Sequence, residues 1–500
     1  MSPSLENCPN EVFETIVGVL ALRDICALRL CNRTLATKST QDHFRSYFRS
    51  KHVDVTGSSL QAFINATQPD RLGCLIQHLV LVGVVNNTQS LEAIVAREKY
   101  SLEEYSLVGE SESESENEWE KEAKRDLEIL KQRQTDYKEL HESGTDVSLL
   151  SEAFSNIATN SKTGKLLDLS LEVVIYRENA ERRLHLLSGG GWRFIWKSAT
   201  NTYHTAIRAL AASKLPIKKL SIFNDRRLQR CSLGCNELGC IDFEDKGLAI
   251  SLASLKSLSV SLSDRIIFQS TKDVERSYDP DEVRDRDIPD HRRDRDEIQA
   301  ETDDEGNFIG LAKLLQLCSQ LEDLEIHYYR LRLRLRGTPD PHRERVLQCV
   351  AEAGTLPKLK RLELRGVYVR EQDLLTFIQR TSVRKLFMYG VIMYRGTFRS
   401  TFDYCTSDAA GMEELYFHKL LEGERSFSFG GLGAYHSQPP LIGADPGPRG
   451  DTLQREGDEI KEQIIYSFRG DNVPAVITPQ DLKRRVPGYR EYGPPDEGIT

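Results

Sequence analysis

The sequence has no long apolar run and no arrangement of cysteines typical of a secreted scaffold. Its longest apolar runs, residues 17–22 and 79–85, are far shorter than the ~20 residues that a membrane helix requires. Most of its ten cysteines are scattered singly through apolar segments, as is usual for reduced thiols inside the cell. No basic segment leads into an apolar stretch at the N-terminus, so no signal peptide is indicated. We therefore expect a cytoplasmic or nuclear protein without a membrane span.

An excess of basic residues is also missing. The 67 Lys and Arg residues are outnumbered by 76 Asp and Glu residues, and the net charge is -9. Domains that bind nucleic acid usually present a basic face, so this class of protein is not indicated. A hydrophobic fraction of 39% and a charged fraction of 29% predict a packed core that is interrupted by solvated insertions.

The expected insertions are residues 99–144 and 268–306. The first begins as an acidic serine tract and continues with helix formers, which predicts a solvated helix or a disordered loop. The second balances opposite charges and has almost no apolar residues, which predicts a disordered insertion. Residues 425–500 are rich in Gly and Pro, which predicts an irregular tail with at most a short element at residues 458–468.

A short pattern recurs in the rest of the chain. It consists of an apolar residue, two variable positions, a second apolar residue that is usually Leu, one variable position and a third apolar residue. The full copies are centred on Leu79, Leu220, Leu258, Leu324, Leu362, Leu386 and Leu415. Two weaker copies are Val53 with Val55, where Val53 takes the central position, and Leu169 with Leu171.

The alternation within each copy places the second and third apolar residues on the same face of a strand. Helical patterns precede many of the copies, at residues 60–66, 205–212, 247–252, 309–318 and 374–379. The repeated unit is therefore a helix, a turn and a strand. Such a unit cannot cover its own apolar face, but a stacked neighbour can.

The spacing of the central leucines is that of leucine-rich repeats in part of the chain. Leu386 follows Leu362 by 24 residues and precedes Leu415 by 29, within the ~20–29 residues of that repeat class. Other intervals are longer, and Asn224 is the only hint of the Asn or Cys that usually follows the strand. We predict an irregular leucine-rich-repeat-like α/β solenoid over residues 51–98, 145–265 and 307–424.

Residues 5–50 carry more apolar side chains than so short a segment can bury. Pro9 suits the first helical position, Asp24 is a plausible cap of a second helix, and Ser39 with Asp42 is a capping-box variant for a third. A unit of about forty residues buries too little surface to be stable alone. Its surplus apolar surface must therefore meet the repeats, another protein or both.

This segment resembles an F-box. The residues that carry the resemblance are Pro9 to Val12 at the opening, Ile16 and Leu20 in the first helix, Asp24 to Arg33 in the second and Phe44-Arg45 at the exit. Cys8 departs from the usual Leu. An F-box followed by degenerate leucine-rich repeats is typical of one family of F-box domain-containing proteins, common in fungi.

The resemblance implies docking onto the Skp-type adaptor of a Skp–cullin–F-box ubiquitin ligase, and through that adaptor to the cullin. The residues expected to bind the adaptor are Pro9, Val12, Ile16, Leu20, Ile25 and Leu28. The repeats would present a protein substrate to the ubiquitin-charged enzyme, so the chain supplies proximity and no catalytic residue.

No motif indicates chemistry carried out by this chain. Cys231, Cys235 and Cys240 lack the paired spacing and the adjacent fourth ligand of a zinc site. The sequence has no H-E-x-x-H or G-x-S-x-G motif and no paired-carboxylate constellation. We expect no metal, no cofactor and no enzymatic activity.

Two groups of residues are candidates for substrate binding. Trp192 and Trp196 belong to an aromatic cluster that is either part of the core or an anchor for a substrate. Arg330, Arg332, Arg334 and Arg336 alternate on an expected strand, where they form a solvated face or engage phosphate on a substrate.

Two alternatives to the adaptor hypothesis remain open. In the first, the chain is a leucine-rich-repeat interaction scaffold unrelated to ubiquitination, and residues 5–50 only cap the solenoid. This alternative predicts that the N-terminal helices pack fully onto the repeats. In the second, the chain is an enzyme, which requires a deep pocket with convergent polar groups.

Overall fold

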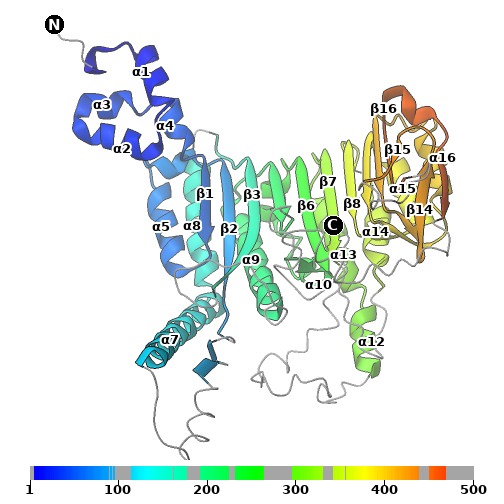
Figure 1. The fold of residues 1–500 in the computed structure, drawn as a ribbon, viewed down its shortest axis with the longest axis horizontal. Helices are drawn as coiled ribbons and strands as arrows, with labels where there is room; N and C mark the ends of the chain where they lie inside the picture. The colour runs from blue at the N-terminus through cyan, green and yellow to red at the C-terminus, as the bar shows by residue number, and fades with distance from the viewer. Residues whose placement is uncertain are drawn as a thin grey trace, which may run out of the picture.

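The computed structural model describes residues 5–88, 91–92, 94–95, 114–161, 163–176, 192–224, 231–263, 295–329, 342–354, 356–437 and 450–468, without the side chains of 114–120, 192–194 and 295–298. This part of the chain is a mixed α/β structure with open sheets. A small helical unit at the N-terminus projects from one corner of the sheet-containing body (Figure 1).

The N-terminal unit consists of short helices. They are η1 (Leu5–Asn7), α1 (Asn10–Val17), α2 (Leu22–Cys31), α3 (Arg33–Lys38) and α4 (Asp42–Ser46). Four α-helices therefore replace the three that we expected, because the backbone of Asn32 is extended and its Oδ1 caps α3 by accepting the Leu35 N–H at 2.9 Å. Two expected caps are wrong. Ala21, not Asp24, precedes α2, and Gln41, not Ser39, precedes α4.

One sheet runs through the body. Its strands are, in spatial order, β1 (Ser50–Asp54), β2 (His78–Asn86), β3 (Asp168–Tyr176), β4 (Lys219–Ile222), β6 (Ser257–Ser263), β7 (Asp323–Tyr329), β8 (Arg361–Arg365), β10 (Lys385–Tyr389), β12 (Glu414–His418), β16 (Thr452–Glu456) and β15 (Ala434–Tyr435). A short strand, β5 (Leu233–Gly234), also pairs with β6. Neighbours from β1 to β12 are parallel, and β16 and β15 add antiparallel strands at one end.

The central leucines of the repeat stand in register across this sheet. The paired residues run in the order Leu79, Leu169, Leu220, Leu258, Leu324, Leu362, Leu386 and Leu415. All eight side chains are buried. The shared strand position predicted from the pattern is therefore confirmed for these copies, including the one at Leu169 that looked weak.

The copy at Val53 is shifted by two residues. Val53 pairs with Leu81, and the exposed Lys51 stands opposite Leu79, so the alignment of Val53 with Leu79 is wrong. The strand β1 lies at the edge of the sheet, and the chain before it belongs to the N-terminal unit. No repeat helix precedes β1 to cover its first positions.

Helices cover the leucine-bearing face of the sheet (Figure 1). They are α5 (Gly57–Thr67), α8 (Thr145–Asn160), α9 (Trp192–Ser213), α11 (Lys246–Leu252), α13 (Gly306–Gln316), α14 (Arg345–Glu352), α15 (Glu371–Arg380) and α16 (Arg399–Cys405). Smaller elements are η2 (Leu72–Leu75) and α10 (Cys235–Leu238). The five helical patterns predicted before the strands coincide with α5, α9, α11, α13 and α15.

The C-terminal segment is more regular than its composition predicts. A second sheet has the strand order β17 (Ile465–Phe468), β14 (Arg425–Gly430), β13 (Leu421–Glu422), β11 (Ile392–Arg395) and β9 (Tyr368–Arg370). Aromatic rings fill the space between the sheets, and Phe427 stacks on Tyr466 with centroids 4.4 Å apart. Together with β15, β16 and η5 (Gly457–Lys461), these strands correct the expectation of irregular structure for residues 425–437 and 450–456, where buried aromatic side chains such as Phe427 and Phe429 join the core. The short element expected at residues 458–468 is observed as η5 and β17, and residues 438–449 and 469–500 lie outside the described part.

Both charged insertions contain helices. In the first, α7 (Glu114–Glu142) packs against β2 and α8, and it buries Leu127 and Leu130 beside Leu91. In the second, α12 (Arg295–Asp303) precedes α13. For residues 114–142 the helix alternative is therefore observed and not the disordered loop, whereas the expectation of disorder is wrong for residues 295–303. Residues 99–113 and 268–294 lie outside the described part.

No described helix combines the length and the apolar character needed to cross a membrane. Within the same described residues, no three His, Cys, Asp or Glu side chains come together as ligands for a metal ion. Cys231, Cys235 and Cys240 are not in disulfide bonds, and the first two are buried.

Candidate protein-docking site on the N-terminal helices

The N-terminal unit has a hydrophobic core of its own. Its buried members are Phe13, Val17, Ile25, Leu35 and Phe44. This cluster is separate from the core of the body, and the body contributes to it only the half-buried side chain of Leu72 from η2. The unit is therefore held together mainly by contacts among its own helices.

Polar contacts fix the same helices to one another. The Nζ of Lys38 donates to the carbonyl oxygens of Glu6 and Cys8, at 2.6 Å each, and ties α3 to the segment before α1. The Arg29 guanidinium lies over the ring of Phe44 with 4.2 Å to its centroid and donates to the Ala36 carbonyl. Arg29 thus joins α2, α3 and α4, which makes it a structural residue and not a docking residue.

Large apolar side chains remain exposed on this unit. Val12 is 50% exposed, Val19 is 83% exposed and Leu30 is 88% exposed. Val12 and Ile16 are four positions apart on α1, and Val19 follows Ile16 by three, so they lie along one side of the helix and the turn after it. Leu30 lies near the end of α2, three positions beyond the exposed Ala27.

The residues predicted to bind an adaptor differ in their exposure. Pro9 and Val12 are exposed, and Ile16, Leu20 and Leu28 are half-buried. Ile25 is fully buried in the core of the unit, so it supports the surface from beneath and cannot contact a partner. Val19 and Leu30, which are more exposed than Val12, were not among the predicted docking residues. The only feature of the sequence that pointed to Val19 and Leu30 was the surplus of apolar residues in and after α1 and in α2.

The body does not enclose these side chains. The unit projects from the body beside α5 and β1 (Figure 1), and the exposure of Val12, Val19 and Leu30 is that of the whole chain. Complete packing onto the repeats, which the scaffold alternative predicts, is therefore not observed. The apolar surface of this unit is available to a second protein.

A second surface lies on the face of the sheet away from the helices. There Phe387, Tyr389 and Tyr416 are half-buried. They alternate along β10 and β12 with buried residues that face the helices, such as Leu386 and Leu415. The rings of Tyr389 and Tyr416 have centroids 4.9 Å apart, and the Arg361 guanidinium lies 4.7 Å from the centroid of Phe387. Aromatic and Arg side chains in such partly covered arrangements are common at the centres of protein interfaces.

A polar network continues this face toward the middle of the sheet. Asn224 donates to the Ser259 hydroxyl at 2.5 Å and accepts from Arg365. Arg365 also pairs with Glu325 at 2.6 Å and with the buried Glu363 at 3.5 Å. Asn224, the only hint of a repeat asparagine in the sequence, thus connects β6 and β8 through side chains.

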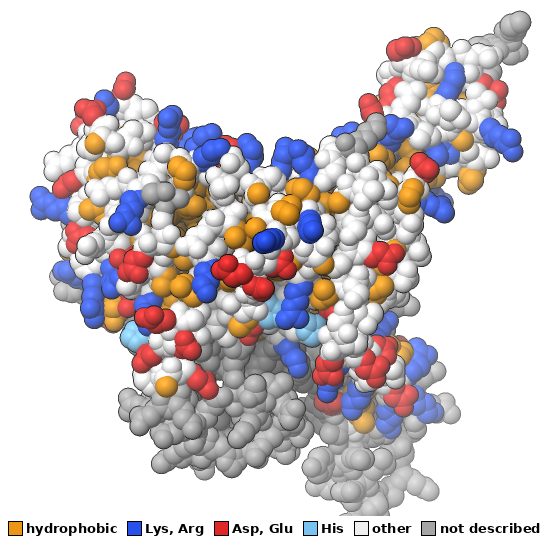
Figure 2. Space-filling model, turned by 180° about the vertical axis from the view of Figure 1, so that it is seen from behind, with side chains coloured by type: hydrophobic (Ala, Val, Ile, Leu, Met, Phe, Trp, Pro, Cys, Tyr) orange, Lys and Arg blue, Asp and Glu red, His pale blue; other side chains and the backbone are white. Residues whose placement is uncertain are grey.

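Ion pairs run along the edge at which the strands begin. The Glu322 carboxylate lies between Lys256 at 2.5 Å and Lys360 at 2.9 Å. In the next turns, Arg384 pairs with Glu413 and Lys385 pairs with Glu414. Lys and Arg side chains gather along this upper edge of the body in Figure 2. Because all four of these cations have a carboxylate partner, their ion pairs join neighbouring repeat units along this edge.

Of the residues predicted to bind a substrate, the structure describes the side chain of Trp196 alone. Trp196 lies on α9 and is 3% exposed within the main core, so its role as a substrate anchor is wrong and its role in the core is confirmed. The side chain of Trp192 and all of Arg330, Arg332, Arg334 and Arg336 lie outside the described residues.

No family model matches this sequence, and a search of curated proteins found no match. What the chain does must therefore be argued from its own residues.

Proposed function

We propose that residues 5–50 are an F-box that docks onto the Skp-type adaptor of a Skp–cullin–F-box ubiquitin ligase. In this proposal the body is a degenerate leucine-rich-repeat array that presents a protein substrate, and no residue of the chain reacts. The observation that carries the proposal is the exposure of Val12, Val19 and Leu30 on a helical unit that already has a complete core.

Energetics favours a protein partner for this surface. Covering a large aliphatic side chain is worth about 1.5–3 kcal/mol, so three such side chains supply a substantial part of a binding free energy. The cores of protein interfaces are apolar, with polar side chains at the rim. Arg23 and Asp24 lie beside the exposed positions of α2 and would belong to that rim.

The body supports the second part of the proposal. Stacked strand–helix units produce a long continuous face that repeat proteins use for binding. Phe387, Tyr389 and Tyr416 form an aromatic group on that face, and we assign the substrate contact to them. Holding a substrate next to another enzyme accelerates its reaction by proximity, which needs no catalytic group here.

The test is association of the purified chain with a purified Skp-type adaptor, measured by calorimetry. Val12→Asp and Leu30→Asp should each weaken binding at least tenfold, because each places a charge in an apolar contact. Ile250→Asp is the matched control, since Ile250 is 49% exposed on α11 of the body, and it should bind as the original chain does.

Both docking variants should unfold at the same temperature as the original chain, because neither side chain belongs to a core. A loss of binding without a loss of stability therefore reports on docking alone. Failure of the original chain to bind the adaptor, or full binding by both variants, would contradict the proposal.

A further inference from the structure

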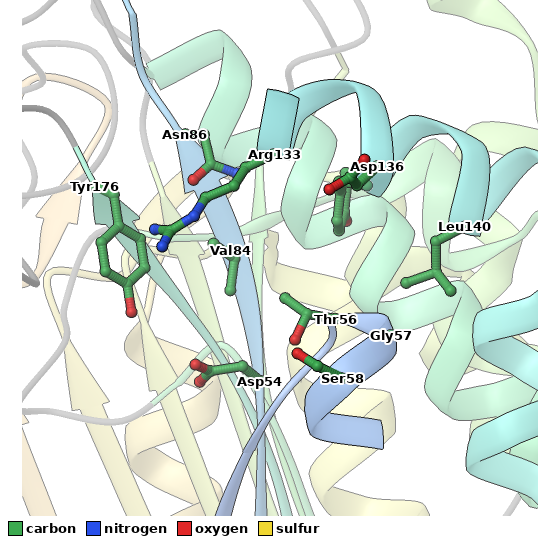
Figure 3. A pocket seen from close by; sticks show the side chains of 11 residues that line it. Asp54, Thr56, Gly57, Ser58, Val84, Asn86, Arg133, Asp136, Leu140 and Tyr176 are labelled. Carbon is green, nitrogen blue, oxygen red and sulfur yellow. The ribbon is translucent and has the colours of Figure 1, made fainter. Parts of the chain in front are cut away.

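Two clefts flank α7 where this helix crosses the end of β2. The larger one has a volume of about 500 Å³, lies toward α5 and is shown in Figure 3. Its guanidinium group, that of Arg133, already lies 5.8 Å from the centroid of the Tyr176 ring. The smaller one has a volume of about 240 Å³ and lies toward α9. The positive groups of this smaller cleft are open to a ligand.

The smaller cleft combines an apolar floor with a polar rim. Residues from three elements line it, among them Val84 and Val85 of β2, Tyr137 and His141 of α7, and Lys197 and Asn201 of α9. The two valines are buried, whereas Lys197 is exposed. A volume of 240 Å³ holds about eight waters at ~30 Å³ each, and it is below the ~300 Å³ at which sites for larger ligands begin. The ligand that fits has only a few heavy atoms.

The orientation of His141 is fixed by a second residue. Its Nδ1 lies 2.9 Å from Oδ2 of the buried Asp146. Hydrogen bonds hold the pKa of Asp146 below its ordinary value, so this carboxyl group is charged and can only accept. The proton of the neutral imidazole therefore stays on Nδ1, and Nε2 is the atom that His141 offers to a ligand. The His141 side chain is 27% exposed, so a ligand in the cleft can reach it.

The charges around the cleft define the charge of the ligand. The ammonium group of Lys138 lies 3.9 Å from the carboxylate of Glu142, and His141 is paired with Asp146. Lys197 has no ion-pair partner among the described residues. Paired charges largely offset each other, and the cleft keeps one positive charge, that of Lys197. A ligand with a single negative charge neutralises it.

We propose that this cleft binds a small monocarboxylate with a short apolar body. The carboxylate lies between Nζ of Lys197 and Nε2 of His141, and the apolar part lies on Val84 and the ring of Tyr137. The site is formed by β2, α7 and α9, to which residues 5–50 contribute nothing. The chain thus carries a small-ligand site that is independent of its docking surface.

The test uses the full chain and the sodium salts of the straight-chain carboxylates from acetate to hexanoate, compared at constant ionic strength. At least one of them should raise the melting temperature, because a ligand that binds only the folded state stabilises it. Calorimetry should then show that the amide and the alcohol with the same carbon skeleton bind at least tenfold more weakly. Inorganic phosphate should also bind at least tenfold more weakly, since it has no apolar part.

Lys197→Met should reduce the affinity for the carboxylate at least tenfold, because it removes the unpaired positive charge. This variant should fold normally, since Lys197 is exposed. Arg208→Met is the matched control, because Arg208 is exposed on the same helix about three turns further along and does not line the cleft. The control should bind as the original chain does.

His141→Asn tests the second contact. The amide of Asn can still donate to Asp146 in the place of Nδ1, but nothing replaces Nε2, so the affinity should fall at least tenfold. In the original chain the affinity should also rise as the pH falls from 8 to 6, because Nε2 must gain a proton to donate to a carboxylate. The other charged or titratable groups around His141 are Asp146, Lys138, Glu142, Lys197 and His204. All of them remain in His141→Asn, so a flat pH profile in this variant assigns the effect to His141.

Three results would overturn the proposal: no carboxylate raises the melting temperature, the amide or phosphate binds as tightly as the carboxylate, or Lys197→Met binds like the original chain. None of these results bears on the F-box assignment, which depends on Val12 and Leu30.

Discussion

The Nδ1 atom of His141 lies 2.9 Å from the Oδ2 atom of Asp146, and this contact joins the last turn of α7 to the first turn of α8. The same Oδ2 accepts the Thr205 hydroxyl of α9 at 2.6 Å, and the other oxygen of Asp146 accepts the Val147 N–H. Asp146 is 2% exposed. The buried carboxylate of Asp146 therefore connects α7, α8 and α9.

Asp146→Asn should lower the free energy of unfolding by about 1–3 kcal/mol at pH 7, because a charged acceptor with three donors is replaced by an amide. Chemical denaturation would measure this change. Asp136→Asn is the control, since Asp136 is exposed and accepts one hydrogen bond from Gln132, and it should change stability by less than about 0.5 kcal/mol. Equal effects of the two substitutions would contradict the assigned role of Asp146.

The same carboxylate predicts a pH dependence. Burial alone would raise the pKa of Asp146, but hydrogen bonds from His141, Thr205 and the Val147 N–H hold it below its ordinary value. A lowered folded-state pKa contributes stability above the unfolded pKa of about 3.9, and this contribution is lost as the pH falls through the folded value. The difference between the original chain and Asp146→Asn should therefore be constant above about pH 5 and shrink below pH 4.

Replacing Arg455 should destabilise the C-terminal end of the body locally. Its buried guanidinium donates to the carbonyls of Leu432 at 3.0 Å, Gln463 at 3.3 Å and Glu462. Burial lowers the pKa of Arg455, although nearby carboxylates partly oppose the shift. Arg455→Met should cost about 3 kcal/mol because it leaves carbonyls without donors.

Hydrogen exchange would locate that loss, with faster exchange in β16 and β17 than in β2. The matched control is Arg384→Met, which breaks an exposed ion pair with Glu413. Exposed pairs are worth about 0–1 kcal/mol, so this control should leave exchange nearly unchanged. An equally small effect of Arg455→Met would mean that these carbonyls are satisfied in another way.

The pKa of Glu322 reports on the ion pairs along the edge of the sheet at which the strands begin. Hydrogen bonds from Lys256 and Lys360 lower the pKa of Glu322 to about 2. Lys360→Gln should raise this pKa toward the ordinary value, and added salt should do the same because exposed charges are screened. Titration of the side-chain carboxyl by NMR measures both shifts. A pKa that does not respond to Lys360→Gln would show that this pair is not formed in solution.

Much of the fold could be predicted because the repeat is a packing signal. Leu324 and Leu362 occupy equivalent strand positions, and each stacked turn must bury its leucine. That reasoning fails where packing is not repeated. Lys51 took the place expected for Val53 because β1 is at the edge of the sheet. The strands β14 and β16 were missed because they flank a segment rich in Gly and Pro, whereas β17 lies within the short element expected at residues 458–468.

The candidate sites were predicted less completely. The surplus of apolar residues in the N-terminal helices indicated a docking surface but not which residues form it. Ile25 is buried and Leu30 is exposed, and this difference depends on how the helices pack against one another. A cleft of about 500 Å³ at the ends of β1, β2 and β3 brings together Asp54, Asn86 and Arg133, which are far apart in sequence and share no motif. No local pattern could have identified that site.

Removal of residues 1–48 distinguishes the docking hypothesis from the scaffold alternative. Among the described residues, Leu72 is the one hydrophobic side chain of the body that packs against the N-terminal core, so the remaining body should lose at most about 1 kcal/mol of stability and keep its circular dichroism spectrum. Arg49 must be kept, because its carbonyl accepts the N–H groups of Gln77 and His78. Binding to the Skp-type adaptor should be abolished. If the shortened chain unfolds or aggregates, residues 5–50 act as a cap of the sheet, which is the role that the scaffold alternative assigns to them.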